Sequence, residues 1–60
     1  MTNEAPRFDV VMRGYQRREV DAWVAQVRSG VTGPPTFTLV MRGYHPGQVD
    51  QYVAQVMAGR

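Results

Sequence analysis

A chain of 60 residues with 43% apolar and 20% charged side chains has the composition of one small globular domain, not of a disordered segment. The absence of cysteine excludes disulfides, thiolate metal sites and cysteine nucleophiles, and no apolar run approaches the roughly 18 residues needed to cross a bilayer. The net charge of +2 is a mild excess of arginines over acids. Because the sequence has neither cysteine nor a long apolar run, we expect a soluble, cytoplasmic protein that could also lie at the inner face of the cell membrane.

An internal repeat organises the chain. FDVVMRGYQRREVDAWVAQVRSG (8–30) aligns without a gap on FTLVMRGYHPGQVDQYVAQVMAG (37–59), and 13 of the 23 aligned positions are identical. The sequence therefore divides into an N-terminal tail (1–7), a first repeat (8–30), a Gly/Pro linker (31–36) and a second repeat (37–60). Because the linker VTGPPT is short and its Pro-Pro pair forbids helix, the two copies must stay in contact and form one pseudo-twofold domain.

Each repeat opens with a short β-favouring run, predicted to be a strand or extended arm over Phe8–Met12 and Phe37–Met41. Gly14 and Gly43 follow these runs and are predicted to be structural hinges that adopt positive φ between arm and helix. The two arms could pair as an antiparallel two-stranded ribbon about the pseudo-twofold axis.

The second half of each repeat has the apolar spacing of an amphipathic helix, at positions i, i+3, i+4 and i+7. His45 is the expected cap of the second helix and Pro46 its first residue, while Gly30 and Gly59 are suited to the αL position after a helix. Helices of about 12 residues are marginal alone, so each needs the other's apolar stripe.

These elements predict a small α+β, helix-dominated domain of tandem arm-turn-helix repeats, in the order β-α-β-α, with two packed helices. Its predicted core joins the valine stripe to the aromatic rings: Phe8, Val20, Trp23, Val24, Val27, Phe37, Val49, Tyr52, Val53 and Val56. Trp23 and Tyr52 lie on the stripe and are interpreted as core anchors.

The repeat resembles the DivIVA domain. The pattern in the second copy is a Phe, then Met-Arg-Gly-Tyr (41–44), Val-Asp (49–50) and Tyr-Val-Ala-Gln-Val (52–56), and the first copy matches at the same positions. This resemblance implies a non-enzymatic bacterial scaffold of cell division, septation or polar growth, related to the GpsB adaptors. The family's domain is a parallel homodimer with two crossing loops, which implies that the two arms of this chain could instead cross as irregular loops. One chain with two repeats could supply both halves of that homodimer, as a monomer with an internal pseudo-dimer. A homodimer of this chain is the alternative.

The family carries an exposed apolar residue beside the Arg of its loop, proposed to insert at the inner membrane surface. Met12-Arg13 and Met41-Arg42 occupy these positions and are candidates for membrane or partner contact. An apolar, polarisable side chain can enter the headgroup region while Arg pairs with a phosphate. The alternative is that the methionines close the core and the arginines pair with aspartates or helix carbonyls.

A second candidate site is also implied by the resemblance. Tyr15 with Asp21, and Tyr44 with Asp50, correspond to a groove that binds an Arg-containing peptide in the GpsB adaptors. A carboxylate beside a tyrosine could take a guanidinium in a bidentate contact. The alternative is a fold-holding bond from each aspartate to an arginine or a loop amide.

The chain offers no basis for catalysis, cofactor binding or metal binding. His45 is the only histidine, and no base and nucleophile are placed together, so we expect no enzyme, no cofactor and no metal site. Arg17 and Arg18 near a helix start are the best hint of a cationic patch. With a pI of about 9.7, a small nucleic-acid-binding domain is the alternative function, although only these two arginines cluster in sequence.

Overall fold

The computed structural model of the chain describes residues 7–30 and 33–59. Two strands and two helices follow one another as β1 (Val10–Tyr15), α1 (Arg17–Arg28), β2 (Leu39–Tyr44) and α2 (Pro46–Ala58). The predicted α+β fold with β-α-β-α order is therefore confirmed. Of the predicted tail only the last residue, and of the predicted linker only residues 33–36, lie within the described part of the chain.

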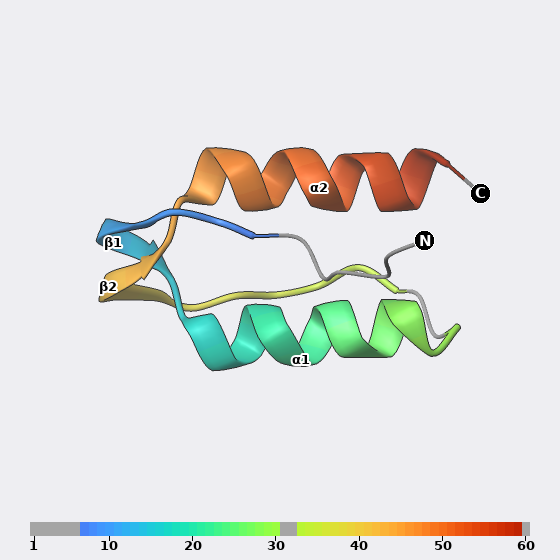
Figure 1. Ribbon diagram of the computed structural model, residues 1–60, viewed down its shortest axis with the longest axis horizontal. Coiled ribbons are helices and arrows are strands. Elements are labelled where there is room, and N and C mark those ends of the chain that lie inside the picture. Colours follow the sequence, from blue (N-terminus) through green and yellow to red (C-terminus); the bar gives the residue numbers. More distant parts are fainter. Residues whose placement is uncertain (1–6, 31–32, 60) are drawn as a thin grey trace.

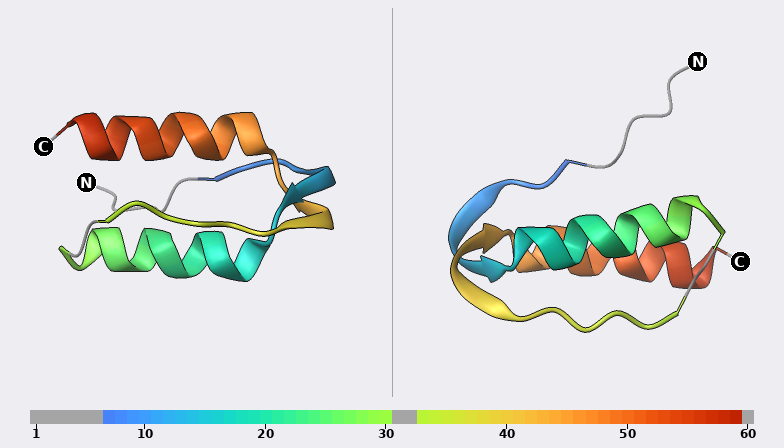
Figure 2. Two further views of the ribbon diagram at one scale, coloured as in Figure 1. Left: turned by 180° about the vertical axis from the view of Figure 1, so that it is seen from behind. Right: turned by 90° about the horizontal axis from the view of Figure 1, so that it is seen from below.

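The two helices lie side by side and begin at the same end of the molecule, where the two strands meet (Figure 1). The extended segments that lead into β1 and β2, here called the first and second arm, run along opposite faces of the helix pair (Figure 2). Each arm reaches the strand end, reverses there and enters its own helix. The result is a helix pair held between two arms.

The strands form a two-stranded antiparallel sheet whose ladder is irregular. Val10, Met12 and Tyr15 face Tyr44, Arg42 and Leu39, so the partner's number falls as the residue number rises. A further pairing, of Tyr15 with Tyr44, breaks this register, and the ladder shifts between successive pairs. Both sequence-based alternatives thus apply in part, because the arms pair as a ribbon and also cross.

The predicted strand bounds were wrong at both ends. Each strand begins two residues later than expected and continues through the glycine to the tyrosine, at Tyr15 and Tyr44. The glycines were expected to end the run, but they sit at the crossing itself and are buried there. Pairing between the two arms, which no local signal reports, keeps the backbone extended past them.

Gly14 and Gly43 are glycines because the two backbones touch, and the predicted positive φ at these hinges was wrong. Within the described residues, positive φ occurs only at Arg13 (64°) and Gly30 (102°). A Cβ on Gly14 would collide with the Gly43 carbonyl, and a Cβ on Gly43 would meet the Tyr15 carbonyl oxygen and lie 2.6 Å from the Gly14 carbonyl carbon. The glycines therefore permit the crossing.

The first arm is bonded to the start of α2. The Asp9 carbonyl accepts from the His45 amide at 2.8 Å, and the Asp9 amide donates to Gln48 Oε1 at 2.8 Å. Gln48 Nε2 returns a bond to Asp9 Oδ2 at 3.0 Å. The first repeat's arm is thus held by the second repeat's helix.

The second arm is bonded to the start of α1 in the equivalent way. The Thr38 carbonyl accepts from the Gln16 amide at 2.9 Å, and the Thr38 amide donates to Glu19 Oε1 at 2.6 Å. The Thr38 hydroxyl lies 3.2 Å from Glu19 Oε2 and donates to it. The repeats have therefore exchanged arms about the pseudo-twofold axis, and neither repeat is a folding unit by itself.

The core lies where the two helices and the two arms meet. Among the residues that the structure describes, four side chains are buried: Val20, Trp23, Val24 and Val49. The other predicted core residues pack against them while partly buried, together with two tyrosines that the prediction omitted: Phe8, Tyr15, Val27, Phe37, Tyr44, Tyr52, Val53 and Val56.

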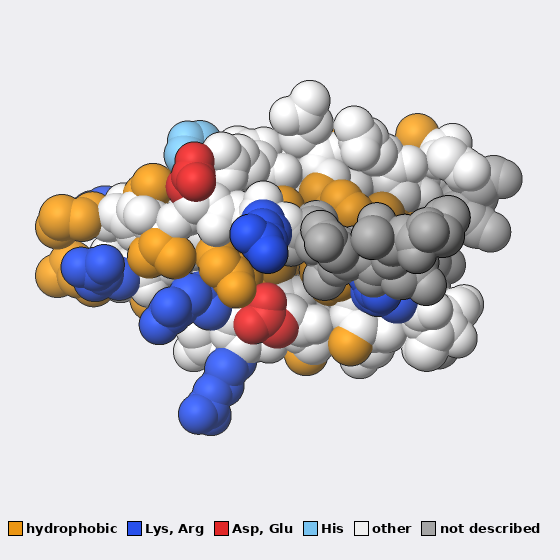
Figure 3. Space-filling view, viewed as in Figure 1, with side chains coloured by type: hydrophobic (Ala, Val, Ile, Leu, Met, Phe, Trp, Pro, Cys, Tyr) orange, Lys and Arg blue, Asp and Glu red, His pale blue; other side chains and the backbone are white. Residues whose placement is uncertain are grey.

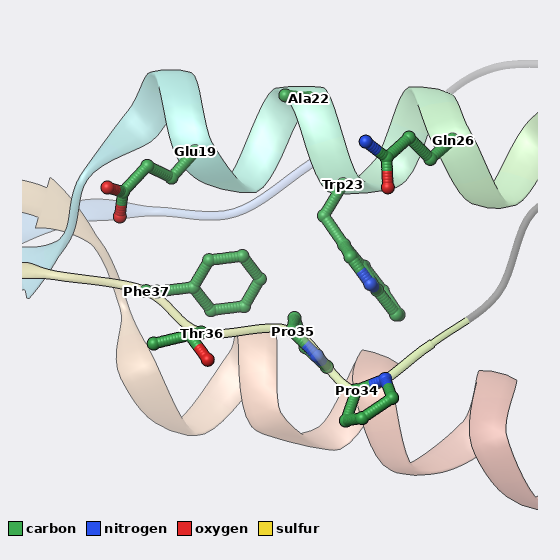
Figure 4. Close-up of a pocket in the computed structure, with 8 residues that line it drawn as sticks. All are labelled: Glu19, Ala22, Trp23, Gln26, Pro34, Pro35, Thr36 and Phe37. Atoms are coloured by element: carbon green, nitrogen blue, oxygen red, sulfur yellow. The ribbon is translucent and has the colours of Figure 1, made fainter.

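The ring of Trp23 joins the two halves of the core. It meets the Tyr52 ring edge to face with centroids 6.2 Å apart. Its Nε1 donates to the Gly33 carbonyl at 2.9 Å, and Pro34 and Pro35 stand against the indole (Figure 4). The linker is therefore fixed on α1 by a directed bond, which explains why a tryptophan stands here and a tyrosine at the equivalent position.

The helix ends differ between the repeats. The predicted cap at His45 is confirmed, because its Nδ1 accepts from the amides of Gly47 at 3.1 Å and Gln48 at 3.3 Å. Gln16, the equivalent residue, makes no side-chain cap. Gly30 adopts the expected left-handed conformation, whereas the same prediction for Gly59 was wrong, since its φ is −81°.

Candidate functional site

An exposed apolar surface forms at the end of the molecule where the strands cross. Met12 and Met41 are 71% and 69% exposed, Leu39 is 63% exposed and Val10 is 41% exposed. These four residues are here called the tip, and Figure 3 shows that hydrophobic side chains gather at the strand end of the molecule. The expectation that the methionines could close the core was therefore wrong.

The strand geometry accounts for the orientation of the tip. Val10 and Met12, like Leu39 and Met41, are two residues apart on their strands, and side chains two apart share one face. These four apolar side chains face water, whereas Gly14 and Gly43 are buried at the crossing. An open hollow of about 260 Å³ lies beside them, lined by Arg13, Leu39, Val40 and Met41.

Arginines lie around the tip. Arg13 and Arg42 are exposed, and among the described residues neither makes an ion pair or a hydrogen bond. The alternative that they pair with aspartates was wrong. Arg17 and Arg18 begin α1 at the same end of the molecule and are exposed as well. Guanidinium groups beside exposed apolar side chains can take anionic groups, such as phosphates, in bidentate contacts.

The two tyrosine and aspartate pairs are bonded across the repeats. Tyr15 donates its hydroxyl to Asp50 Oδ1 at 2.9 Å, and Tyr44 donates to Asp21 Oδ1 at 3.0 Å. The resemblance placed Tyr15 with Asp21 and Tyr44 with Asp50, whereas the arm exchange brings each tyrosine to the other helix. The expected bonds from these aspartates to arginines or loop amides are absent among the described residues.

Hydrogen bonding to aspartate and burial together raise the pKa of both tyrosines above the ordinary value of 10.0. For Tyr15 the main cause is the hydrogen bond to Asp50, followed by burial. For Tyr44 burial contributes most and the bond to Asp21 next, while the positive charge of Arg17 opposes the rise in pKa. The aspartates thus hold protonated tyrosines, and each keeps a second carboxylate oxygen for another donor.

Each helix has one hollow between it and the arm packed on it, and the two hollows are equivalent in position. The hollow on α1 has a volume of about 340 Å³ and contains Glu19, Trp23 and the Pro-Pro segment in its lining (Figure 4). The hollow on α2 has a volume of about 270 Å³ and contains Phe8, Gln48 and Tyr52. The linings are mostly amide, proline and aromatic side chains, and Glu19, their one carboxylate, has no histidine, lysine or second carboxylate beside it in the hollow.

No group of three or more metal-ligating side chains occurs within residues 7–30 and 33–59. In the same ranges, no helix has the length and apolar character needed to cross a membrane. Sequence reasoning found Met12 and Met41 but missed Val10 and Leu39, although the two-residue spacing along each arm could have indicated them.

Comparison of the chain with protein families, curated proteins and solved structures found no match.

Proposed function

We propose that the chain is a non-enzymatic interaction module of the DivIVA type, which docks its tip on the anionic inner surface of a bacterial membrane during division, septation or polar growth. The observation that carries this proposal is the joint exposure of Met12 and Met41 beside Arg13 and Arg42. The pattern shared with the DivIVA domain supports the biological setting, and a protein partner of the division or cell-wall machinery would complete the scaffold.

The tip has the energetic scale of a reversible membrane anchor. Full burial of a Met or Leu side chain is worth about 1.5–3 kcal/mol, so Met12, Leu39 and Met41, each about two-thirds exposed, would each gain about 1–2 kcal/mol. Each arginine near an anionic surface adds about 1 kcal/mol. The sum is close to the affinity of a single acyl chain, with an association constant of about 10⁴ M⁻¹, which gives weak and reversible binding.

Placement of both methionines at one end makes them act together. They come from different repeats, yet the crossing sets their strands side by side, so one rigid body presents both to the same plane. The duplication therefore supplies in one chain the two contacts that a homodimer would otherwise assemble. Binding does not wait for association of two chains, and it should be independent of protein concentration.

Co-sedimentation with vesicles tests the proposal. The wild-type chain should sediment with vesicles that contain phosphatidylglycerol and remain in solution with neutral phosphatidylcholine vesicles. The variant M12S/M41S should lose most of the binding. The matched control M57S alters a methionine that is 42% exposed on α2, away from the crossing, and should bind like the wild type.

The arginines and the alternative function are tested in the same assay. R13Q/R42Q should weaken binding to anionic vesicles by roughly thirtyfold, because two contributions of about 1 kcal/mol are lost and each 1.4 kcal/mol is tenfold. Duplex DNA added to the assay tests the nucleic-acid-binding alternative. If the chain binds DNA, its affinity for DNA should fall steeply as the salt concentration rises, and M12S/M41S should not change that affinity. Wild-type protein that stays in the supernatant with anionic vesicles would refute the membrane proposal.

A further inference from the structure

Two of the side-chain hydrogen bonds that join the repeats are equivalent in position but differ in chemistry. On one side of the pseudo-twofold axis the Asp9 carboxylate accepts from the Gln48 amide at 3.0 Å. On the other side the Glu19 carboxylate accepts from the Thr38 hydroxyl at 3.2 Å. Asp9 is the counterpart of Thr38 and Glu19 the counterpart of Gln48, so each side pairs one carboxylate with one neutral donor.

This arrangement distributes both acids onto the first repeat. Asp9 stands on the first arm and Glu19 on α1, while the second repeat supplies the two neutral groups, Thr38 and Gln48. A first repeat paired with another first repeat would place Asp9 against Glu19 on both sides of the axis. Two carboxylates at hydrogen-bond distance lack a proton to share and repel each other.

The second repeat is not restricted in this way. Paired with another second repeat, it would bring the Thr38 hydroxyl to the Gln48 amide, and both groups can donate and accept. The backbone bonds at the same sites do not distinguish these cases, because the arm amide donates equally to Glu19 Oε1 or Gln48 Oε1. At these two contacts the selectivity therefore resides in the four side chains.

We infer that Asp9, Glu19, Thr38 and Gln48 are specificity-determining residues for repeat pairing, which make the first repeat reject itself and select an arm-turn-helix repeat with neutral donors at these positions. The partner so defined is the second repeat, within the same chain or in another copy, or a related repeat that carries an amide opposite Asp9 and a hydroxyl opposite Glu19. Like charges at a shared contact are a recognised means of excluding a wrong partner.

Full-length variants can imitate each pairing without separating the repeats. T38D/Q48E gives both sides the chemistry of two first repeats, and D9T/E19Q gives both sides the chemistry of two second repeats. The variant with all four substitutions exchanges the two chemistries between the sides and restores one carboxylate and one neutral donor on each. Urea unfolding followed by the fluorescence of Trp23, the only tryptophan, measures the folding equilibrium constant of each chain.

We expect T38D/Q48E to lower the folding constant by roughly tenfold to a hundredfold, since exposed like-charge pairs and two lost charge-assisted bonds each contribute modestly. D9T/E19Q should lose less, and the fourfold variant should return to within about threefold of the wild type. Because the contacts are exposed, about 0.5 M salt should reduce the loss in T38D/Q48E.

The control T36D adds an acid at an exposed position of the second arm that makes none of these contacts. Two results would overturn the inference, because neither depends on which carboxylates meet. The first is an equal loss in the folding constant for T38D/Q48E and D9T/E19Q. The second is a fourfold variant that is no more stable than T38D/Q48E. A salt-independent loss would also overturn it, by assigning the effect to packing.

Discussion

The crossing of the two backbones at Gly14 and Gly43 makes Gly14→Ala the most sensitive perturbation of the fold. An added methyl group would lie against the carbonyl groups of Gly43 and Tyr44. These carbonyl groups are backbone atoms of the other strand, β2, so no side-chain rotation can relieve the overlap. The arms would have to separate at the crossing.

The expected loss exceeds that of ordinary overpacking, which costs about 1–3 kcal/mol in a core that can adjust. Separation also strains the flanking bonds from Gln16 to Thr38 and from His45 to Asp9, each worth about 1 kcal/mol. We therefore expect Gly14→Ala to cost about 3 kcal/mol or more. A chain of 60 residues has a total stability of about 3–9 kcal/mol, so the variant should lose at least about a third of that stability, and all of it if the wild type lies at the lower end of the range.

Urea unfolding measured by circular dichroism and by Trp23 fluorescence gives the free energy of unfolding. Gly43→Ala should behave like Gly14→Ala, because the crossing is mutual. Gly33→Ala is the matched control: an added Cβ there meets nothing within 4 Å, so stability should stay within about 1 kcal/mol of the wild type or rise. A Gly14→Ala chain as stable as the control would show that the arms do not cross in contact.

Three further predictions concern individual side chains. Because the pKa values of Tyr15 and Tyr44 are raised in the folded chain, their contribution to stability should be complete below pH 10 and should decline as the pH rises above 10. Urea unfolding of Y15F/Y44F between pH 9 and 11 should show a smaller decline in the free energy of unfolding than the wild type shows. His45→Ala removes a helix cap and should cost about 1 kcal/mol, measured by thermal unfolding at pH 7.5. Arg13→Gly should stabilise the chain by up to about 1 kcal/mol because Arg13 has positive φ, whereas Arg42→Gly should not; equal shifts in melting temperature would contradict the difference in backbone conformation.

Local sequence patterns predicted the helices and strands because the spacing of apolar residues in each element depends only on residues close in the chain. The spacing of Val20, Trp23, Val24 and Val27 has the period of one helix face, and the same spacing recurs in the second repeat. The order β-α-β-α and the requirement for contact between copies followed from the gap-free repeat and the short linker. The cap at His45 was also readable, since Pro46 directly follows it.

The exchange of arms could not be predicted from the same patterns. A repeat that folds on itself and one that pairs with its neighbour present identical local sequences, so no periodicity distinguishes Tyr15 bonded to Asp21 from Tyr15 bonded to Asp50. The role of Gly14 was misassigned for the same reason: close approach of a distant segment and positive φ both require glycine. The compensating differences at 9/48 and 19/38 become meaningful only once the arms are known to cross.

The most direct test of the membrane proposal uses the absence of cysteine, since a single introduced thiol can be labelled without competition. M12C, M41C and M57C would each carry an environment-sensitive fluorophore and be titrated with phosphatidylglycerol vesicles. Labels at positions 12 and 41 should shift to the blue as they enter the apolar layer, while the label at 57, at the opposite end of α2, should keep its emission in water. Unchanged emission at 12 and 41, or an equal shift at all three positions, would contradict docking through the tip.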